Sequence, residues 1–248
     1  MKNSKRIISC VLASAMTIST VPAAAYAADP IPQGSVVPYA NEITSLDELK
    51  SAITVASDNT STMITLGANI EVSETLTIPA SKVIVLDLNG HSISATTDVN
   101  VIDNSGNLTI KNGTIAAKDK GKDSQGFGID NKSGASLTID QDADQTTQIA
   151  GRTAIQSDGT LVINDGEITS YNRMGVNSRA GSTTTINGGT ISSPTGSSGY
   201  GRAFQVVGEA TITGGTITSG GSSGAGDNYM NAIGVYGNGH LTIKPAEG

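Results

Sequence analysis

The most regular pattern in the chain is an eight-residue segment in which apolar and polar residues alternate around a glycine-containing bend. It reads Thr-Thr-Ile-Asn-Gly-Gly-Thr-Ile at 184–191. Near-copies stand at 108–115, 161–168 and 210–217, and the first half alone occurs at 136–139 and 241–244. Strict alternation predicts a strand, and a pair of Gly, Asn or Asp predicts a tight bend. Each full copy is therefore expected to form two short strands.

The spacing of these copies predicts a solenoid. Their equivalent first positions are 108, 137, 161, 184, 210 and 241, so successive copies lie 23 to 31 residues apart. A strand unit that recurs at about 20–50 residues indicates coils stacked on one another. Stacking at about 4.8 Å would pair equivalent strands into parallel sheets. We therefore expect a stack of coils over 57–248.

Each coil is expected to contain three strands that point equivalent side chains into the core. In the first strand these are Ile102, Ile129, Ile155, Val176, Phe204 and either Ile233 or Val235. In the repeat strand they are Leu108/Ile110, Leu137/Ile139, Leu161/Ile163, Ile186, Ile212 and Leu241/Ile243. In the third strand they are Ile115, Ile168, Ile191 and Ile217. Variable loops are expected at 116–125, 192–200 and 218–230, with an insertion at 140–148.

The chain before the repeats predicts a cap on the solenoid. Ser45 and Glu48 form a capping box, and Leu46, Leu49 and Ile53, with Val55, would give one apolar face. We expect a helix at 46–56 within a capping segment at 43–56, since solenoids cover the apolar end of their first coil. Residues 28–42 are expected to be an extended lead-in, followed by strands at 62–66, 75–78 and 83–88.

The first 27 residues have the pattern of a secretory signal peptide. A basic start precedes an apolar run over 7–21 and a small-residue site at 25–27, which predicts cleavage after Ala27. The chain's single cysteine, Cys10, lies inside this segment, so the mature protein is expected to lack disulfides. We expect a secreted or cell-surface bacterial protein without membrane insertion after cleavage.

Composition excludes one class of partner. Removing 1–27 takes away three of the 15 basic residues and none of the 22 acidic ones, which leaves a balance of 12 − 22 = −10. Nucleic-acid binding requires a basic face, so this partner is not expected. Aromatic residues make up 3% of the chain, which suits thin coils filled by Ile, Val and Leu.

The segment Leu86-Asp87-Leu88-Asn89-Gly90-His91-Ser92-Ile93, followed by Leu-Thr-Ile-Lys-Asn-Gly-Thr-Ile repeats, resembles right-handed parallel β-helix proteins of the pectin-lyase-like fold. The resemblance covers about 43–244 and is nearest to adhesin-type, pectate-lyase-like domains on Gram-positive surface proteins. It implies an all-β, right-handed, single-stranded parallel β-helix with a short N-terminal capping helix. Because this fold hosts lyases, hydrolases and non-catalytic binders, it implies no single activity.

Catalytic and metal patterns are weak. Asp140, Asp142 and Asp144 superficially resemble a calcium loop, but the Gly and the closing acidic residue are missing, which favours an acidic solvated loop. Calcium is the one cofactor kept open. The Arg-x-Pro-x-x-Arg pattern of pectate lyases is absent, as are the paired-carboxylate patterns of polygalacturonases. His91 and His240 are isolated and form neither a metal site nor a triad.

Tyrosine and arginine residues recur just before the first strand of successive coils. The positions are Tyr171/Arg173, Tyr200/Arg202, Tyr229/Asn231 and, without the tyrosine, Arg152. Tyrosine faces pack on sugar rings and arginine forks suit carboxylates or hydroxyls, so these columns predict a glycan-binding groove. The alternative is that the tyrosines cover the loop bases, with the arginines solvated or paired with acids.

Threonine forms an outward column at Thr109, Thr138, Thr185, Thr211 and Thr242, with Val162 in between. Such a row could order water as in an ice-binding face, but strand propensity also favours Thr.

Taken together, these patterns lead us to expect a non-catalytic, adhesin-like module that binds a polysaccharide or a host surface. A polysaccharide lyase or hydrolase, an ice-binding protein and a purely structural solenoid stay open. The last coil has no cap, which leads us to expect further domains or a packing partner there.

Overall fold

The structure is a computed structural model that describes residues 37–39, 41–120, 123–193, 201–220 and 231–244. The expected signal peptide and most of the lead-in lie outside the described residues, as do Tyr200 and Tyr229. The described residues belong to one compact unit.

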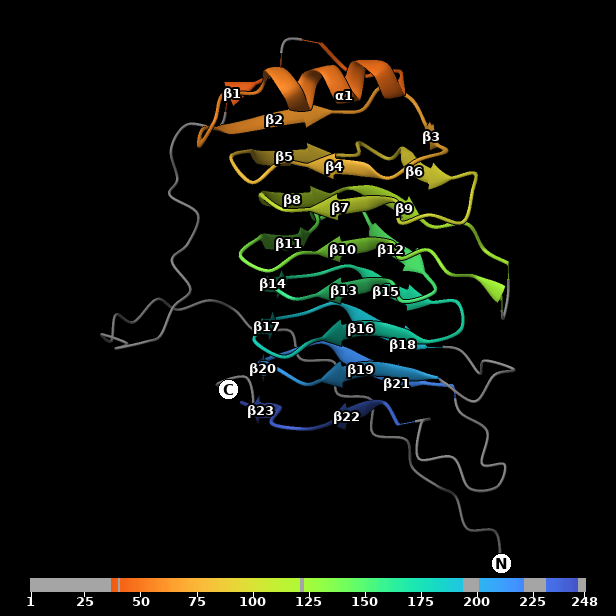
Figure 1. Cartoon of the computed structure of the whole chain (residues 1–248), viewed down its shortest axis with the longest axis vertical. Coiled ribbons are helices and arrows are strands. Elements are labelled where there is room, and N and C mark those ends of the chain that lie inside the picture. The colour runs from red at the N-terminus through yellow and green to blue at the C-terminus, as the bar shows by residue number, and fades with distance from the viewer. Residues whose placement is uncertain (1–36, 40, 121–122, 194–200, 221–230, 245–248) are drawn as a thin grey trace, which may run out of the picture. The chain divides into compact units, whose positions relative to one another are not determined.

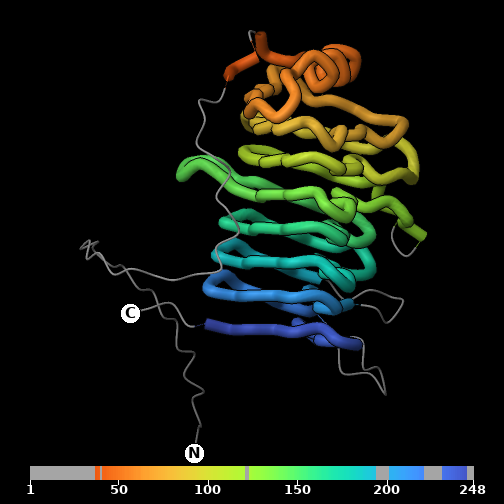
Figure 2. The backbone as a smooth tube through the Cα atoms, turned by 60° about the vertical axis from the view of Figure 1, so that its left-hand side comes forward, coloured from red at the N-terminus to blue at the C-terminus, as the bar shows by residue number. Residues whose placement is uncertain are grey.

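The chain folds as a right-handed parallel β-helix of about seven turns with one helix, which confirms the predicted fold class (Figures 1 and 2). Sheet 1 holds the first strands: β4 (Leu76–Ile78), β7 (Ile102–Asn104), β10 (Ile129–Asn131), β13 (Ile155–Ser157), β16 (Met174–Ser178), β19 (Arg202–Val206) and β22 (Ile233–Val235).

Two further sheets complete the coils. Sheet 2 holds the repeat strands: β1 (Val37–Pro38), β2 (Ser61–Thr65), β5 (Val83–Asp87), β8 (Asn107–Lys111), β11 (Ser136–Asp140), β14 (Thr160–Ile163), β17 (Thr183–Ile186), β20 (Glu209–Ile212) and β23 (His240–Ile243). Sheet 3 holds β3 (Ile70–Val72), β6 (Ser92–Ala95), β9 (Gly113–Ala116), β12 (Thr147–Gly151), β15 (Glu167–Ser170), β18 (Thr190–Ser193) and β21 (Thr216–Ser219).

The strand register confirms the inward columns. Sheet 1 aligns Ile102, Ile129, Ile155, Val176, Phe204 and Ile233, so Ile233 rather than Val235 continues this column. Sheet 3 aligns Ile115, Ile149, Ile168, Ile191 and Ile217. Ile149 supplies the third strand of the coil with the insertion, which the sequence pattern had missed.

Two residues of the repeat strands depart from the predicted set of inward residues, which left out Thr184 and included Ile243. Thr184 occupies the inward column of Leu161 and Ala210, and its side chain is fully buried, so it does not face water. Ile243 is aligned with the buried Ile212, yet it is 64% exposed because it lies on the last strand of sheet 2. The outward threonine column is in register, as predicted.

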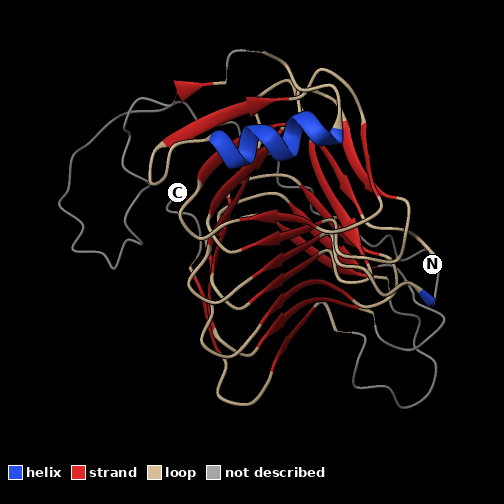
Figure 3. Cartoon of the chain, turned by 45° about the horizontal axis from the view of Figure 1, so that its top comes forward, coloured by secondary structure: helices blue, strands red, loops and turns tan. Residues whose placement is uncertain are grey.

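The helix α1 (Leu46–Val55) lies across the end of the coils (Figure 3). Its residues Leu49, Ala52 and Ile53 are buried, but Val55 is 64% exposed, so Val55 is not part of the apolar face. The Ser45 hydroxyl accepts a hydrogen bond from Glu48 N at 3.3 Å, as a capping box requires. Glu48 reaches back to Thr44 instead of Ser45, accepting from its N–H at 2.8 Å and from its hydroxyl at 2.9 Å. In the part of the chain that the structure describes, no helix is long and apolar enough to span a membrane.

The turns from sheet 1 to sheet 2 alternate in length from coil to coil. Longer turns lie at 79–82, 132–135, 179–182 and 236–239, and two-residue turns lie at 105–106, 158–159 and 207–208. Each short turn contains a glycine, Gly106, Gly159 or Gly208, that nests against two carbonyl oxygens of the long turn before it. A Cβ at any of these glycines would approach both oxygens to under 3.0 Å, which no side chain tolerates without backbone movement.

Candidate functional site

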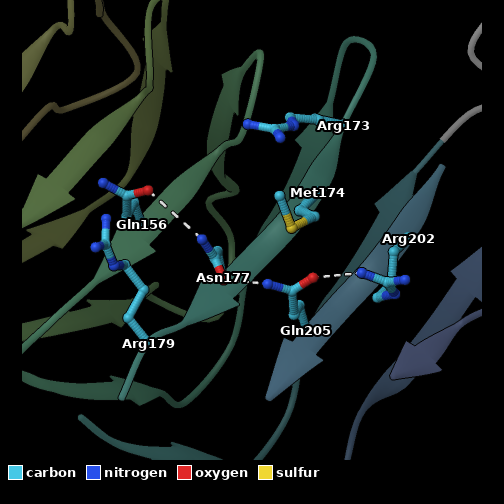
Figure 4. Close-up of a pocket in the computed structure, with 7 residues that line it drawn as sticks. All are labelled: Gln156, Arg173, Met174, Asn177, Arg179, Arg202 and Gln205. Carbon is cyan, nitrogen blue, oxygen red and sulfur yellow. Dashed lines mark hydrogen bonds between the residues drawn. The ribbon is translucent and has the colours of Figure 1, made fainter. Parts of the chain in front are cut away.

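A shallow depression of about 330 Å³ lies on the outer face of sheet 1 (Figure 4). Its residues come from β13, from β16 and its flanks, and from β19. The lining consists of three arginines, three side-chain amides and one methionine: Arg173, Arg179, Arg202, Gln156, Asn177, Gln205 and Met174. It lies on the coils where arginine was expected to gather, but most of its lining was not predicted from the sequence.

The three amides are in line because each follows an inward residue of sheet 1. Side chains alternate between the two faces of a strand, so the residue after each core residue points outward. The register places Asp130, Gln156, Asn177 and Gln205 side by side on successive strands. Neighbouring parallel strands are about 4.8 Å apart, which lets these side chains reach one another.

The three amides form a hydrogen-bonded row, which we call the amide ladder (Gln156, Asn177 and Gln205). Gln205 Nε2 donates to Asn177 Oδ1 at 3.0 Å, and Asn177 Nδ2 donates to Gln156 Oε1 at 3.5 Å. Gln156 Nε2 then donates to Asp130 Oδ1 at 3.3 Å. At the other end, Arg202 donates to Gln205 Oε1. A continuous polar row thus crosses four coils.

Arg202 lies in a different environment from the one its sequence position suggested. Its side chain is buried and donates to the hydroxyl of Tyr236, whose ring it stacks on with Cζ 4.4 Å from the centroid. The register pairs Arg202 with Met174 and not with Arg173, so the two arginines do not form one column. Arg202 therefore lines the depression as a buried cation held by Tyr236 and Gln205.

The other arginines give the depression its positive charge. Arg179 is half-exposed and forms an ion pair with Asp158, with Nε and Oδ1 3.1 Å apart. Burial and the charge of Arg173 lower the pKa of Arg152, so these two guanidinium groups lie within electrostatic range. The lining carries three guanidinium groups and no carboxylate, although Asp158 pairs with Arg179 from outside the lining and the chain as a whole is acidic.

Tyr171, the one predicted tyrosine among the described residues, does not line this depression. The hydroxyl of Tyr171 donates to the carbonyl oxygen of Ala117 at 2.9 Å, and its ring packs against the core. Burial, with the nearby charge of Asp119, raises the pKa of Tyr171. This geometry matches the alternative in which Tyr171 covers the base of a loop. Asn231 is exposed just before β22 and does not line the depression.

The candidate calcium residues have other contacts. Asp142 accepts from Lys111 Nζ at 2.9 Å and from Asn112 Nδ2 at 2.7 Å, and these bonds lower its pKa. Asp140 Oδ1 accepts from Gln141 N at 2.9 Å. Among the described residues, Asp140, Asp142 and Asp144 included, no group of three His, Cys, Asp or Glu side chains is placed to hold a metal ion. Asp142 thus anchors the insertion to the preceding coil.

The sequence contains a pattern that corresponds to the amide ladder, but the pattern can be recognised only once the strand register is known. Five successive coils place a polar residue directly after the inward residue of the first strand: Asp103, Asp130, Gln156, Asn177 and Gln205.

Comparison of the chain with protein-family models, curated proteins and solved structures found no match, so its site must be interpreted from its own geometry.

Proposed function

We propose that the mature protein is a secreted or cell-surface, non-catalytic β-helix module that binds a polysaccharide carrying carboxylates, in the manner of an adhesin of the pectin-lyase-like type. The observation that carries this proposal is the row of three amides flanked by three arginines on one face of sheet 1. Arginine pairs with carboxylates through two parallel hydrogen bonds, and side-chain amides suit sugar hydroxyls.

The shape of the site supports binding along a chain of sugars. The depression is shallow, and the amide ladder runs along the stacking direction, so an extended ligand can contact several coils at once. The positive lining would attract an acidic polymer despite the negative charge of the whole protein. The expected signal peptide adds the secretory route that a surface-binding role requires.

The competing proposal is a polysaccharide lyase or glycoside hydrolase. Glycoside hydrolysis uses two carboxyl groups about 5–9.5 Å apart across the scissile bond, and the residues that line the depression include none. The proposal therefore predicts binding without turnover. Incubation with polygalacturonate, with and without calcium, is expected to yield no unsaturated ends and no reducing ends. Release of either product would overturn the non-catalytic part of the proposal.

Titration of the full chain with polygalacturonate tests the binding part. Arg173→Ala is expected to weaken binding at least about tenfold, because a hydrogen bond to a charged group contributes about 1.5–3 kcal/mol. Lys50→Ala is the matched control, since it removes one positive charge on α1, where Lys50 pairs with Glu74 outside the depression. Neutral galactan is the ligand control. Equal binding by wild type and Arg173→Ala would remove this depression as the site.

A further inference from the structure

The ends of the amide ladder have opposite hydrogen-bonding capacities. The guanidinium of Arg202 can only donate, and the ionised carboxylate of Asp130 can only accept. Each amide between them can donate and accept, and rotating it by half a turn exchanges those two roles. With a donor fixed at one end and an acceptor at the other, only one direction satisfies every bond of the row.

We infer that Arg202 and Asp130 are positioning residues that fix the orientation of the three amides between them, so that the depression presents a preset order of donors and acceptors. The observed bonds all run one way, from Arg202 through Gln205, Asn177 and Gln156 to Asp130. Bonds in such a row polarise one another, which strengthens the preference for one direction.

The amide ladder uses only half of the hydrogen-bonding capacity of its three side chains. Each amide has two N–H groups and two oxygen lone pairs, and the ladder uses one of each. Within the described residues, the second N–H and the second lone pair of each amide have no other hydrogen-bond partner, and the direction of the row determines where each of them lies. A reversed row would exchange donors for acceptors at every amide. The link to a sugar ligand rests on the proposed function, whereas the direction of the row does not.

The chain contains a matched control for Asp130. Asp103 precedes Asp130 in the same column of sheet 1, and Lys132 bridges the two carboxylates, with Lys132 Nζ 2.9 Å from Asp103 Oδ2. Asp103 also accepts from Asn100 Nδ2 at 3.0 Å, and it makes no bond to the amide ladder. Asp103→Asn and Asp130→Asn therefore each remove one carboxylate that pairs with Lys132. Only Asp130→Asn changes an end of the amide ladder.

Nuclear magnetic resonance of the side-chain amides in the full chain tests the inference without a ligand. Asp130→Asn leaves a single oxygen at this position for two donors, Lys132 and Gln156. When Lys132 takes that oxygen, the new amide N–H faces Gln156 and opposes the direction that Arg202 sets, and the resulting mismatch can lie at any bond of the row. The amide signals of Gln156, Asn177 and Gln205 are expected to shift or broaden, although only Gln156 touches Asp130. Asp103→Asn is expected to leave the Asn177 and Gln205 signals in place. Unchanged Asn177 and Gln205 signals in Asp130→Asn would overturn the inference.

Two additions complete the test. Arg202→Gln removes the charged donor that polarises the row, so it is expected to shift the signals of the same three amides and serves if Asp130→Asn does not fold. With polygalacturonate as the probe, Asp130→Asn is expected to weaken binding about two- to tenfold, the effect of one neutral hydrogen bond, while Asp103→Asn binds like wild type. Disturbed amide signals in Asp130→Asn, together with a wild-type protein that does not bind polygalacturonate, would support the inference and reject the proposed ligand.

Discussion

The ring of Tyr236 lies over the guanidinium of Arg202, with Cζ 4.4 Å from the ring centroid. The same guanidinium donates to the Tyr236 hydroxyl and to Gln205. Gly234 makes this possible, because a Cβ at that position would lie under 3.0 Å from atoms of both the ring and Arg202. The last coil thus holds the cation that begins the amide ladder.

Tyr236→Leu is expected to lower the free energy of unfolding by about 1–2 kcal/mol, since it removes both the cation–π contact and a hydrogen bond to a buried cation. Tyr236→Phe keeps the ring and is expected to cost less. Urea unfolding of the three proteins measures both differences. An equal loss in the two variants would show that the ring itself contributes nothing.

Gly159→Ala is expected to destabilise the chain by about 2–3 kcal/mol, because its Cβ would meet the carbonyl oxygens of Lys132 and Ala135. Gly134→Ala is the matched control in the neighbouring long turn. Gly134 has φ +81° and open space around its Cβ position, so only backbone strain of about 1 kcal/mol is expected there. Equal losses of stability would contradict the nesting of alternate turns.

Thr184→Val is expected to stabilise the chain by about 1–2 kcal/mol. Thr184 Oγ1 is buried and has no hydrogen-bond partner within the described part of the chain, and valine has nearly the same shape without the hydroxyl. Thr185→Val makes the same exchange on the outward face and is expected to change stability by less than about 0.5 kcal/mol. Denaturant unfolding that ranks the two variants the other way would refute the inward assignment.

Stability is expected to fall at acidic pH through the carboxylates that are hydrogen-bonded in the folded state. Asp98 accepts from the backbone of Gln125 at 2.8 Å and of Gly126 at 3.0 Å, and pairs with Lys120, which holds its pKa below its ordinary value of 3.8. A lowered pKa contributes stability above the ordinary value, and that contribution is lost as the pH falls through the lowered value.

Urea unfolding between roughly pH 5 and pH 2 measures this loss. Asp98→Asn is expected to be less stable than wild type at neutral pH and to lose less on acidification. Parallel curves for the two proteins would exclude Asp98 as a contributor to the acid-induced loss of stability.

At the alkaline end, burial opposes protonation of Lys111, but its bonds to Asp142 and Asp87 raise its pKa above 10.5. The contribution of Lys111 to the free energy of unfolding is therefore lost only above that value.

The coil architecture could be predicted from the sequence because each coil repeats the same pattern of inward apolar residues followed by a bend. Ile110, Ile139 and Ile163 each follow an alternating strand and precede a bend, and one-residue slips would expose them all. The sequence was insufficient where a coil departs from the pattern. Ile149 was missed because the insertion separates it from its repeat strand, and Thr184 was left out of the inward column because a polar residue occupies a core position.

The site was only partly predictable because its contacts depend on register between coils. Position alone suggested that Arg173 and Arg202 share a column, but the strands align Arg202 with Met174. The amide ladder requires knowing that Gln156, Asn177 and Gln205 are neighbours, although each pair is separated by more than twenty residues. A tyrosine that stacks on a ligand and one that covers a loop, as Tyr171 does, have the same sequence signature.

The alternation of long and short turns makes two coils, not one, the structural unit of this solenoid. Gly159 packs directly against the carbonyl oxygens of the long turn at 132–135, so neighbouring coils have turns of complementary length. Deleting one coil would set two turns of the same kind against each other, whereas deleting a pair restores the match. A shortened or lengthened version of this protein should therefore be built by adding or removing coils in even numbers.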